Sequence, residues 1–233
     1  MSAWSQPLKL SVLKPSNAMP TFDIDTAFAR LADFMPRYPR AAMFQLAEEG
    51  YCSPFEQLIS CIISIRTYDE VSLPVSRQLF AKASTPQAMS ALSVAEIGAL
   101  IAKSTYAEQK AGQIRAIAQT LVQDYGGSLP CDEAVMLSFK GVGPKCAHLA
   151  LGIACRQPYI SVDVHVHRVI NRWGYVATKT PEKTTKALED KLPEKYWIET
   201  NRLLMPFGKY VCKGQYAECS SCPLADMCPK IGL

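Results

Sequence analysis

The spacing of apolar residues predicts α-helices along most of the chain and gives almost no signal for strands. Segment 107–125 repeats apolar residues about every three or four positions, which is the period of one buried helix face. The residues on this face are Ile114, Ile117, Leu121 and Val122. Segment 55–66 (FEQLISCIISIR) is apolar almost all round, as expected of a fully buried helix. The pattern therefore predicts an all-α fold.

Capping signals mark where several of these helices begin and end. Ser53-Pro54 followed by Glu56 combines an N-cap, a proline in the first turn and a capping-box glutamate. Comparable start and stop signals occur at Thr85-Pro86, Ser93-x-x-Glu96 and Gly126-Gly127. Further helices are predicted at about residues 132–139, 144–155, 164–173 and 183–192. Residues 1–21 show no such period, and we expect a flexible N-terminal extension there.

Composition narrows the class of protein. The chain has 233 residues, with 25 Lys and Arg against 21 Asp and Glu, and 48% of the residues are hydrophobic. This apolar content is sufficient for a packed core and excludes disorder as the main state. No run is apolar enough for a transmembrane helix, and the first 20 residues do not resemble a secretory signal. Nine cysteines, an odd number, without an export signal predict an intracellular protein of the cytoplasm or nucleoid with reduced thiols.

Basic charge is concentrated in the second half of the chain. Segment 140–213 contains 13 Lys and Arg against 6 Asp and Glu, a balance of +7, while the rest has a balance of −3. Such a segment can form a face that approaches phosphates, because each basic contact releases counterions. Scatter over solvated helix faces is the alternative, and charge alone leaves both open.

The cysteines fall into two sets. Five are isolated among mostly apolar residues, and we expect them to behave as small core side chains. These five are Cys52, Cys61, Cys131, Cys146 and Cys155. The other four lie within 17 residues, at Cys212, Cys219, Cys222 and Cys228. Four thiolates in one short loop can hold either a structural zinc ion or an iron–sulfur cluster.

A glycine-containing turn, LSFKGVGPK at 137–145, connects two predicted helices. Gly141 and Gly143 flank a small apolar residue, so the backbone is free to adopt positive φ in a tight hairpin. Pro144 then occupies the first helical position, where no amide donor is needed. The exposed amides and the positive end of the next helix could bind a DNA phosphate. An ordinary connection between two helices is the alternative.

Lys145 and Asp163 are candidate catalytic residues. Lys145 lies in the first turn of a predicted helix, where the helix dipole disfavours a cation. A neutral amine there can act as a nucleophile, although the side chain could instead simply reach into solvent. Asp163 precedes another helix and can serve as its N-cap. Its carboxylate could also stabilise positive charge on a sugar ring during glycosidic bond cleavage.

Three motifs occur in a characteristic order along the chain. They are LSFKGVGPKCA, then SVDVHVHRVINR, then C-x6-C-x2-C-x5-C. With these motifs, the chain resembles endonuclease III of the helix-hairpin-helix DNA glycosylase superfamily from about residue 22 to the C-terminus. The resemblance implies two helical domains with a DNA-binding cleft between them. A six-helix barrel domain with the helix-hairpin-helix motif would span 47–157, and an iron–sulfur cluster domain would combine 22–46 with 158–233.

The resemblance also implies a bifunctional DNA glycosylase and AP lyase of base excision repair. The enzyme would act as a monomer on double-stranded DNA that contains oxidised pyrimidines, other damaged bases or abasic sites. Lys145 corresponds to the family's catalytic lysine and Asp163 to its catalytic aspartate. Once the damaged base is flipped out, Lys145 would form a Schiff base with the sugar that undergoes β-elimination. Asp163 would stabilise the oxocarbenium-like transition state.

Further positions correspond to family residues that contact DNA. Arg66 stands where the family typically has a glutamine that fills the gap left by the flipped base. Tyr106 matches an apolar wedge residue, and an aromatic ring could stack there equally well. A solvated arginine and a packed tyrosine are the alternatives. The remaining correspondences are His165 near the DNA backbone, Gly141 and Gly143 in the hairpin, Lys209 beside the cysteine loop, and a 4Fe–4S cluster on the four clustered cysteines.

Two rival functions remain open at this point. A monofunctional mismatch glycosylase of the same superfamily could share the cysteine loop. However, adenine-specific relatives replace the lysine, and thymine-mismatch relatives have tyrosine in its place. A non-catalytic iron–sulfur DNA-binding protein would keep Lys145 and Asp163 only by coincidence. The lysine therefore favours the bifunctional enzyme.

Overall fold

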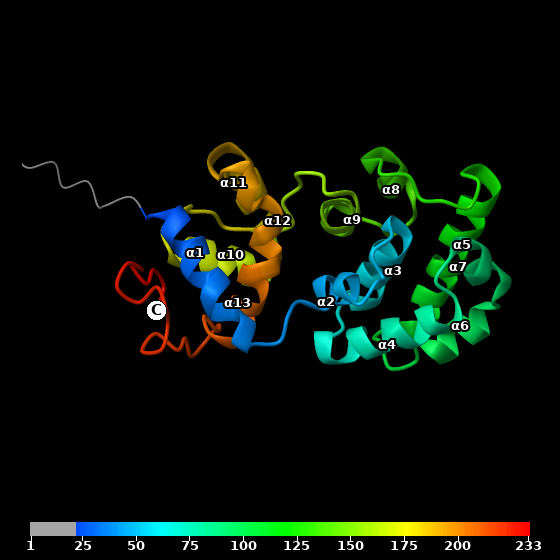
Figure 1. Cartoon of the computed structure of the whole chain (residues 1–233), viewed down its shortest axis with the longest axis horizontal. Helices are drawn as coiled ribbons and strands as arrows, with labels where there is room; N and C mark the ends of the chain where they lie inside the picture. Colours follow the sequence, from blue (N-terminus) through cyan, green and yellow to red (C-terminus); the bar gives the residue numbers. More distant parts are fainter. Residues whose placement is uncertain (1–21) are drawn as a thin grey trace, which may run out of the picture.

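The computed structural model describes residues 22–233, so the extension predicted for 1–21 lies outside the described residues. Within 22–233 the protein is helical throughout its regular structure and contains no strand, which confirms the predicted all-α fold (Figure 1). None of these described helices combines the length and the apolar character needed to cross a membrane.

The helical elements follow one another through short connections. In chain order they are α1 (Ile24–Phe34), η1 (Met35–Arg37), α2 (Ala42–Glu48), α3 (Pro54–Ser64), α4 (Asp69–Lys82), α5 (Pro86–Ala91), α6 (Val94–Leu100), α7 (Ala107–Asp124), α8 (Glu133–Ser138), α9 (Pro144–Cys155), α10 (Val164–Arg172), α11 (Pro181–Lys191), η2 (Glu194–Tyr196), α12 (Trp197–Glu199), η3 (Thr200–Leu204) and α13 (Met205–Tyr210). Figure 1 shows them in two groups along an elongated molecule, with α1 and α10–α13 at one end and α2–α9 at the other.

Helix α3 lies at the centre of the first hydrophobic core. It begins as predicted, with a capping box in which Ser53 and Glu56 satisfy each other's backbone amides. Four aliphatic side chains of α3 are fully buried: Leu58, Ile59, Ile62 and Ile63. The helix packs against α4, α7 and α9, which confirms that 55–66 contains a buried helix. Burying each such side chain stabilises the fold by about 1.5–3 kcal/mol.

The long helix α7 covers another side of this core, with one correction to the predicted face. The residues that are buried as predicted are Ile114, Ile117 and Leu121. Val122 is 38% exposed, so its assignment to the buried face was wrong. One residue advances the helix by about 100°, which turns Val122 away from the core when Leu121 points into it. Gly126 and Gly127 follow the helix with φ of 60° and 78°, in agreement with the predicted stop.

The second core surrounds Trp173, which is almost completely buried. Phe22 stacks on its ring at a centroid distance of 4.9 Å, and Phe207 approaches at 6.2 Å. Helix α1 joins this core although it lies at the other end of the sequence from α10 and α13. Arg30 strengthens the connection, because its Nη1 donates to Asp226 Oδ1 at 2.7 Å in the C-terminal segment.

The structure corrects the predicted redox state of four of the five isolated cysteines. Cys61 and Cys146 form a disulfide that joins α3 to α9. Cys131 and Cys155 form a second disulfide, which joins the loop before α8 to the end of α9. Only Cys61 and Cys146 are buried, whereas Cys52 and Cys131 are exposed. The core position is therefore confirmed for Cys61 and Cys146, and Cys52 is a free thiol, but the prediction of reduced thiols was wrong for the four paired cysteines. Helix packing brings cysteines that are distant in sequence to Cα separations of 5.6 and 5.9 Å, which sequence spacing does not reveal.

Candidate active site

A pocket of about 620 Å³ lies between elements of the two cores. Its walls come from the loop between α3 and α4 and from the starts of α9 and α10, together with α13. Five residues predicted from the sequence line it: Arg66, Lys145, Asp163, His165 and Lys209. The pocket therefore brings together side chains that are widely separated in the sequence. Tyr106, Gly141 and Gly143 lie outside its walls.

Lys145 is the second residue of α9 and its side chain is exposed. Its neighbour Cys146 is buried and bonded to α3, which fixes the first turn of α9 on the core. The carbonyl oxygen of Lys145 accepts a hydrogen bond from Ser161 Oγ at 3.3 Å, two residues before Asp163. The main chain of Lys145 is thus held in place, while its flexible side chain can reach into the pocket.

Asp163 is the N-cap of α10, as predicted. Its Oδ1 accepts from the amides of His165 and Val166, both at 2.9 Å, which satisfies two unpaired donors of the first turn. Its Oδ2 has no hydrogen-bond partner among the residues that the structure describes. The cap therefore fixes the carboxylate in one orientation and leaves one oxygen available on the pocket wall.

Sequence reasoning missed Asp69, which lines the same pocket. Its Oδ2 accepts from the amide of Ala42 at 3.3 Å. Burial raises the pKa of Asp69, and the nearby Lys209 opposes this shift. An acidic residue in the first turn of a helix is ordinary, so the only available signal was its position three residues after Arg66.

Lys209 has an acidic partner on the pocket wall. Its Nζ lies 2.7 Å from Glu70 Oε1, and its side chain is mostly buried. Burial lowers the pKa of Lys209, but the hydrogen-bonded Glu70 and the charge of Asp69 outweigh this and raise it. Lys209 therefore joins α13 to α4 as a cation held between two carboxylates, and only part of its charge remains for a phosphate.

The hairpin between α8 and α9 forms as predicted, but its two glycines differ. Gly141 has a φ of +83°, and a Cβ there would lie 2.8 Å from Gln113 Nε2. That amide donates to the carbonyl of Lys140 at 2.8 Å and anchors the turn on α7. Gly143 has an extended backbone (φ −104°) as the N-cap of α9. The predicted freedom to adopt positive φ is thus used at Gly141 and not at Gly143, because an N-cap residue is extended.

Arg66 and Tyr106, predicted separately, lie in contact at the tips of two neighbouring loops. Arg66 Nη1 donates to Tyr106 Oη at 3.3 Å, and its guanidinium carbon lies 5.9 Å from the tyrosine ring centroid. Tyr106 is 55% exposed, which rules out the alternative of a packed tyrosine. Both residues have left-handed backbones, with φ of 55° and 60°. Their side chains form a single exposed unit at the edge of the pocket, which Arg66 lines and Tyr106 does not.

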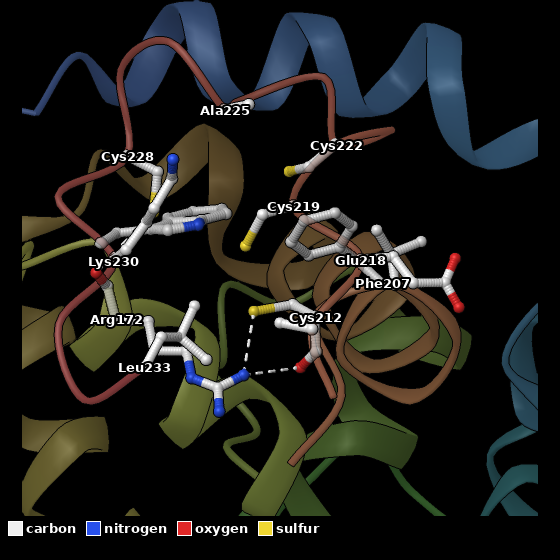
Figure 2. Close-up of a pocket in the computed structure, with 13 residues that line it drawn as sticks. Arg172, Phe207, Cys212, Glu218, Cys219, Cys222, Ala225, Cys228, Lys230 and Leu233 are labelled. Atoms are coloured by element: carbon white, nitrogen blue, oxygen red, sulfur yellow. Dashed lines mark hydrogen bonds between the residues drawn. The ribbon is translucent and has the colours of Figure 1, made fainter. Parts of the chain in front are cut away.

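The four clustered cysteines line one further pocket, and Figure 2 shows them around its walls. The apolar part of the lining includes Trp173, Phe207, Val211 and Leu233. Arg172 Nη1 donates to Cys212 Sγ at 3.4 Å (Figure 2), and the amide of Leu224 donates to Cys222 Sγ at the same distance. Such N–H donors are typical neighbours of metal-bound thiolates, because they stabilise negative charge on sulfur.

Burial raises the pKa of two of these thiols, Cys222 and Cys228, and the neighbouring cysteines raise it further. A positively charged metal centre would instead lower the pKa of these thiols, because it binds the thiolate form. Across residues 22–233, no group of three or more His, Cys, Asp or Glu side chains that could hold a metal ion is formed. The four thiols have the chemistry of a thiolate-bound centre and line one pocket, but they are not gathered into a ligand set, so the cluster stays a prediction.

Comparisons with known proteins agree with this arrangement. Residues 59–194 match the family model of the HhH-GPD superfamily base excision DNA repair protein. The chain is 39% identical to endonuclease III of Thermotoga maritima over 75% of this chain and 82% of that protein. It is 36% identical to endonuclease III-like protein 1 of Bos taurus, over 75% of this chain and 58% of the bovine protein.

Solved structures show the same relationship. A non-covalent endonuclease III–DNA complex superposes with a TM-score of 0.75 at 28% identity, covering 89% of this chain and 94% of that one. A trapped covalent endonuclease III–DNA intermediate superposes with a TM-score of 0.74 at 29% identity, with the same coverage. A family match over more than half of the sequence and a relative at 39% identity lead to one conclusion. The chain belongs to the HhH-GPD superfamily of base excision DNA repair proteins.

Proposed function

We propose that the protein is a bifunctional DNA glycosylase and AP lyase that removes oxidised pyrimidines from double-stranded DNA inside the cell, acting as a monomer. One observation carries this proposal: Lys145 and Asp163 line the same pocket from the starts of two different helices. An amine and a carboxylate that face one cavity supply a nucleophile and an acid–base partner for cleaving a glycosidic bond. The endonuclease III names of the relatives support the same reaction class.

The chemistry begins with attack of Lys145 Nζ, as the free amine, on the anomeric carbon of the damaged nucleotide. The bond between this carbon and the base breaks, and the base departs with the electron pair and takes up a proton. Loss of the amine proton and opening of the sugar ring give a Schiff base. Removal of a proton from the adjacent sugar carbon then expels the 3′ phosphate and cuts the strand. Water finally hydrolyses the Schiff base and frees Lys145.

Asp163 contributes through the oxygen that the helix cap leaves free. Because Oδ1 is held by two amides, Oδ2 keeps a fixed position on the pocket wall. A preorganised negative charge stabilises positive charge that develops on the sugar ring without reorganisation. The same oxygen can accept the proton that the attacking amine loses.

Duplex DNA must present its damaged nucleotide to this pocket outside the base stack, at a cost of a few kcal/mol. The unit of Arg66 and Tyr106 is suited to occupy the space that the nucleotide leaves, because both side chains are exposed next to the pocket. The hairpin at Gly141 and Gly143 is suited to hold a phosphate with its amides and the start of α9. The four clustered cysteines would hold a 4Fe–4S cluster that orders the C-terminal segment.

Borohydride trapping tests the proposal. Wild-type protein is incubated with a duplex that contains thymine glycol or an abasic site, and the Schiff base is reduced to a stable adduct. We expect a covalent complex with wild type and none with Lys145→Ala. Lys183→Ala is the matched control, because Lys183 is an exposed helical lysine outside the pocket walls, and it should trap normally.

The outcomes separate the rival functions. Trapping that survives in Lys145→Ala contradicts the assigned nucleophile. Base release by wild type without trapping or strand cleavage indicates a monofunctional glycosylase. Binding of damaged duplex without either reaction indicates a non-catalytic DNA-binding protein.

A further inference from the structure

A buried lysine lies outside the active-site pocket, near the first turn of α7. Lys110 is only 4% exposed, and its Nζ donates three hydrogen bonds. The acceptors are the carbonyls of Ile63 at 2.7 Å and Ile65 at 2.8 Å, and Thr67 Oγ1 at 3.1 Å. Burial lowers the pKa of Lys110 to about 8, so the ammonium form still predominates at pH 7. Its three protons match the three acceptors.

The position of these acceptors explains how the ammonium is stabilised. Ile63 and Ile65 lie at the C-terminal end of α3, where a helix leaves carbonyl groups without partners. This end also carries the negative pole of the helix dipole, which favours a cation. Lys110 thus acts as a cap for α3 that is contributed by a different helix.

The same ammonium holds the loop that follows α3 against the loop that precedes α7. Thr67 Oγ1, which accepts from Lys110, also accepts from the amide of Thr105 at 3.1 Å. In return, Thr105 Oγ1 donates to the carbonyl of Arg66 at 2.8 Å. Lys110, Thr67 and Thr105 therefore form one network that joins the two loops.

The residues at the tips of these two loops are Arg66 and Tyr106. Both have left-handed backbones, which are strained for residues other than glycine and persist only where the surroundings hold them. Arg66 lies between the carbonyl of Ile65 and Thr67, which are both bound by Lys110. Tyr106 directly follows Thr105 of the same network. The network is thus placed to hold both strained tips at once.

We propose that Lys110 is a positioning residue, which acts on DNA through Arg66 and Tyr106 without touching the DNA itself. It locks the two loop tips into one preformed wedge that enters the base stack beside the flipped nucleotide. The inference rests on the proposed function for its DNA substrate. It predicts that Lys110 supports the opening of the duplex, whereas Lys145 and Asp163 perform the bond cleavage.

The test compares two substrates, of which only one has a base stack that the wedge must open. An abasic site in a single strand has no stack to open, whereas thymine glycol in a duplex does. In Lys110→Met, kcat/KM on the duplex should fall about 10- to 100-fold, the range expected for small misplacements. Trapping on the single strand should stay within about 2-fold of wild type. Lys103→Met, which changes an exposed lysine in the loop of Tyr106, is the matched control and should behave as wild type on both.

A second, milder variant distinguishes a positioning role of Lys110 from a general loss of folding. Thr105→Val, outside the pocket walls, removes the hydroxyl that donates to the Arg66 carbonyl, changes the volume very little and leaves the ammonium on the α3 carbonyls. It should show the same selective loss on the duplex, to a smaller degree. A double-mutant cycle of Lys110→Met with Tyr106→Ala should be strongly non-additive, because both substitutions remove the same wedge.

A spectroscopic measurement reports the wedge without catalysis. A duplex is prepared with 2-aminopurine opposite a tetrahydrofuran analogue of an abasic site, and its fluorescence rises when the stack is opened. Wild type should raise the signal on binding, and saturating Lys110→Met should raise it much less. If wild type opens the stack but never forms a trapped Schiff base, the proposed function is wrong. The fluorescence measurement still tests the role of Lys110 in that case.

Three results would overturn the positioning role. One is an equal loss by Lys110→Met on single-stranded and duplex substrates, which would show general damage to the fold. Another is an unchanged duplex rate together with an unchanged fluorescence response. The third is full additivity with Tyr106→Ala, which would show that Lys110 acts elsewhere.

Discussion

At the scale of single residues, Asp163 uses its two carboxylate oxygens for different purposes. Oδ1 caps α10 through the amides of His165 and Val166, while Oδ2 stays free on the pocket wall. A cap requires an oxygen acceptor but no charge, so asparagine can replace it with little loss. Stabilising a positive sugar ring requires the charge itself. The two tasks can therefore be separated by substitution.

We expect Asp163→Asn to keep the free energy of unfolding within a few tenths of a kcal/mol of wild type. Base release should nevertheless fall about 100- to 1,000-fold, the usual effect of losing one preorganised electrostatic group. Asp163→Ala should show the same loss of rate and, in addition, about 1 kcal/mol of lost stability. Urea unfolding and single-turnover base release measure the two effects.

Ser93→Ala is the matched control, because Ser93 caps α6 through the amide of Glu96 and is not among the residues of the pocket walls. It should lose about 1 kcal/mol of stability and keep the wild-type rate of base release. A wild-type rate in Asp163→Asn would contradict an electrostatic role for the carboxylate.

Local signals determined which site residues could be predicted. Lys145 and Asp163 stand next to helix starts that proline and the apolar period reveal, so the sequence alone indicated both. Asp69 and Lys110 owe their properties to burial by segments distant in the sequence. Taken alone, each is an ordinary charged residue near the start of a helix. Nothing in their local sequence distinguishes them from solvated side chains.

At the scale of elements, local signals also explain several predicted helices and one missed helix. Helices α3 and α6 begin with a capping box and α9 begins with a proline, and all three starts were predicted. Helix α4 was not predicted, because it contains Pro74 and because Ser72 and Ser76 lie on its buried face. Small polar residues at core positions hide the helical period. Packing against α2 and α3 therefore decides the conformation of this segment.

The segment after α13, residues 211–233, is irregular and contains neither a helix nor a strand. Arg172 holds its beginning by donating to the carbonyls of Cys212 and Gly214 at 3.2 and 2.7 Å. Within the described part of the chain, Val211 and Leu224 are the apolar side chains of this segment that are almost completely buried. So long an irregular segment has little core of its own, and a bound metal centre is one of the few ways to order it.

We therefore expect Cys219→Ser to lose the brown colour and the iron of a 4Fe–4S protein, and to expose 211–233 to protease. Iron and sulfide analysis together with limited proteolysis measure both effects. Cys52→Ser is the matched control, because Cys52 is a free exposed cysteine outside the pocket of the four clustered cysteines. It should keep its iron and its resistance to protease. Colourless wild-type protein that contains zinc would contradict the cluster.

At the scale of the whole molecule, the candidate site depends on how the two cores meet. Lys145 begins a helix of the first core, and Asp163 begins a helix of the second. Ser161 links the two, since its Oγ donates to the Lys145 carbonyl and its own carbonyl accepts from Asn201 Nδ2 at 3.4 Å. Helices α9 and α12 also pack closely together. The distance between the amine and the carboxylate follows from this junction.

Gly152 allows the close approach of α9 to α12, because a Cβ there would lie 2.5 Å from Ile198 Cδ1. That atom is the end of a flexible side chain, so Gly152→Ala should stay close to wild type. Gly152→Val adds two branches that Ile198 cannot avoid, and α12 must move. We expect about 1–3 kcal/mol of lost stability from overpacking. Base release should fall by about 100-fold as the two halves of the site separate.

Gly112→Val provides the matched control for this last substitution, because Gly112 lies within α7 with open space around its Cβ position. It should keep both its stability and its rate of base release, measured by thermal unfolding and single-turnover assay. If Gly152→Val were destabilised but kept its full rate, the positions of Lys145 and Asp163 would not depend on the junction. A parallel loss of rate and of Schiff base trapping would instead show that the packing between the two cores sets the geometry of catalysis.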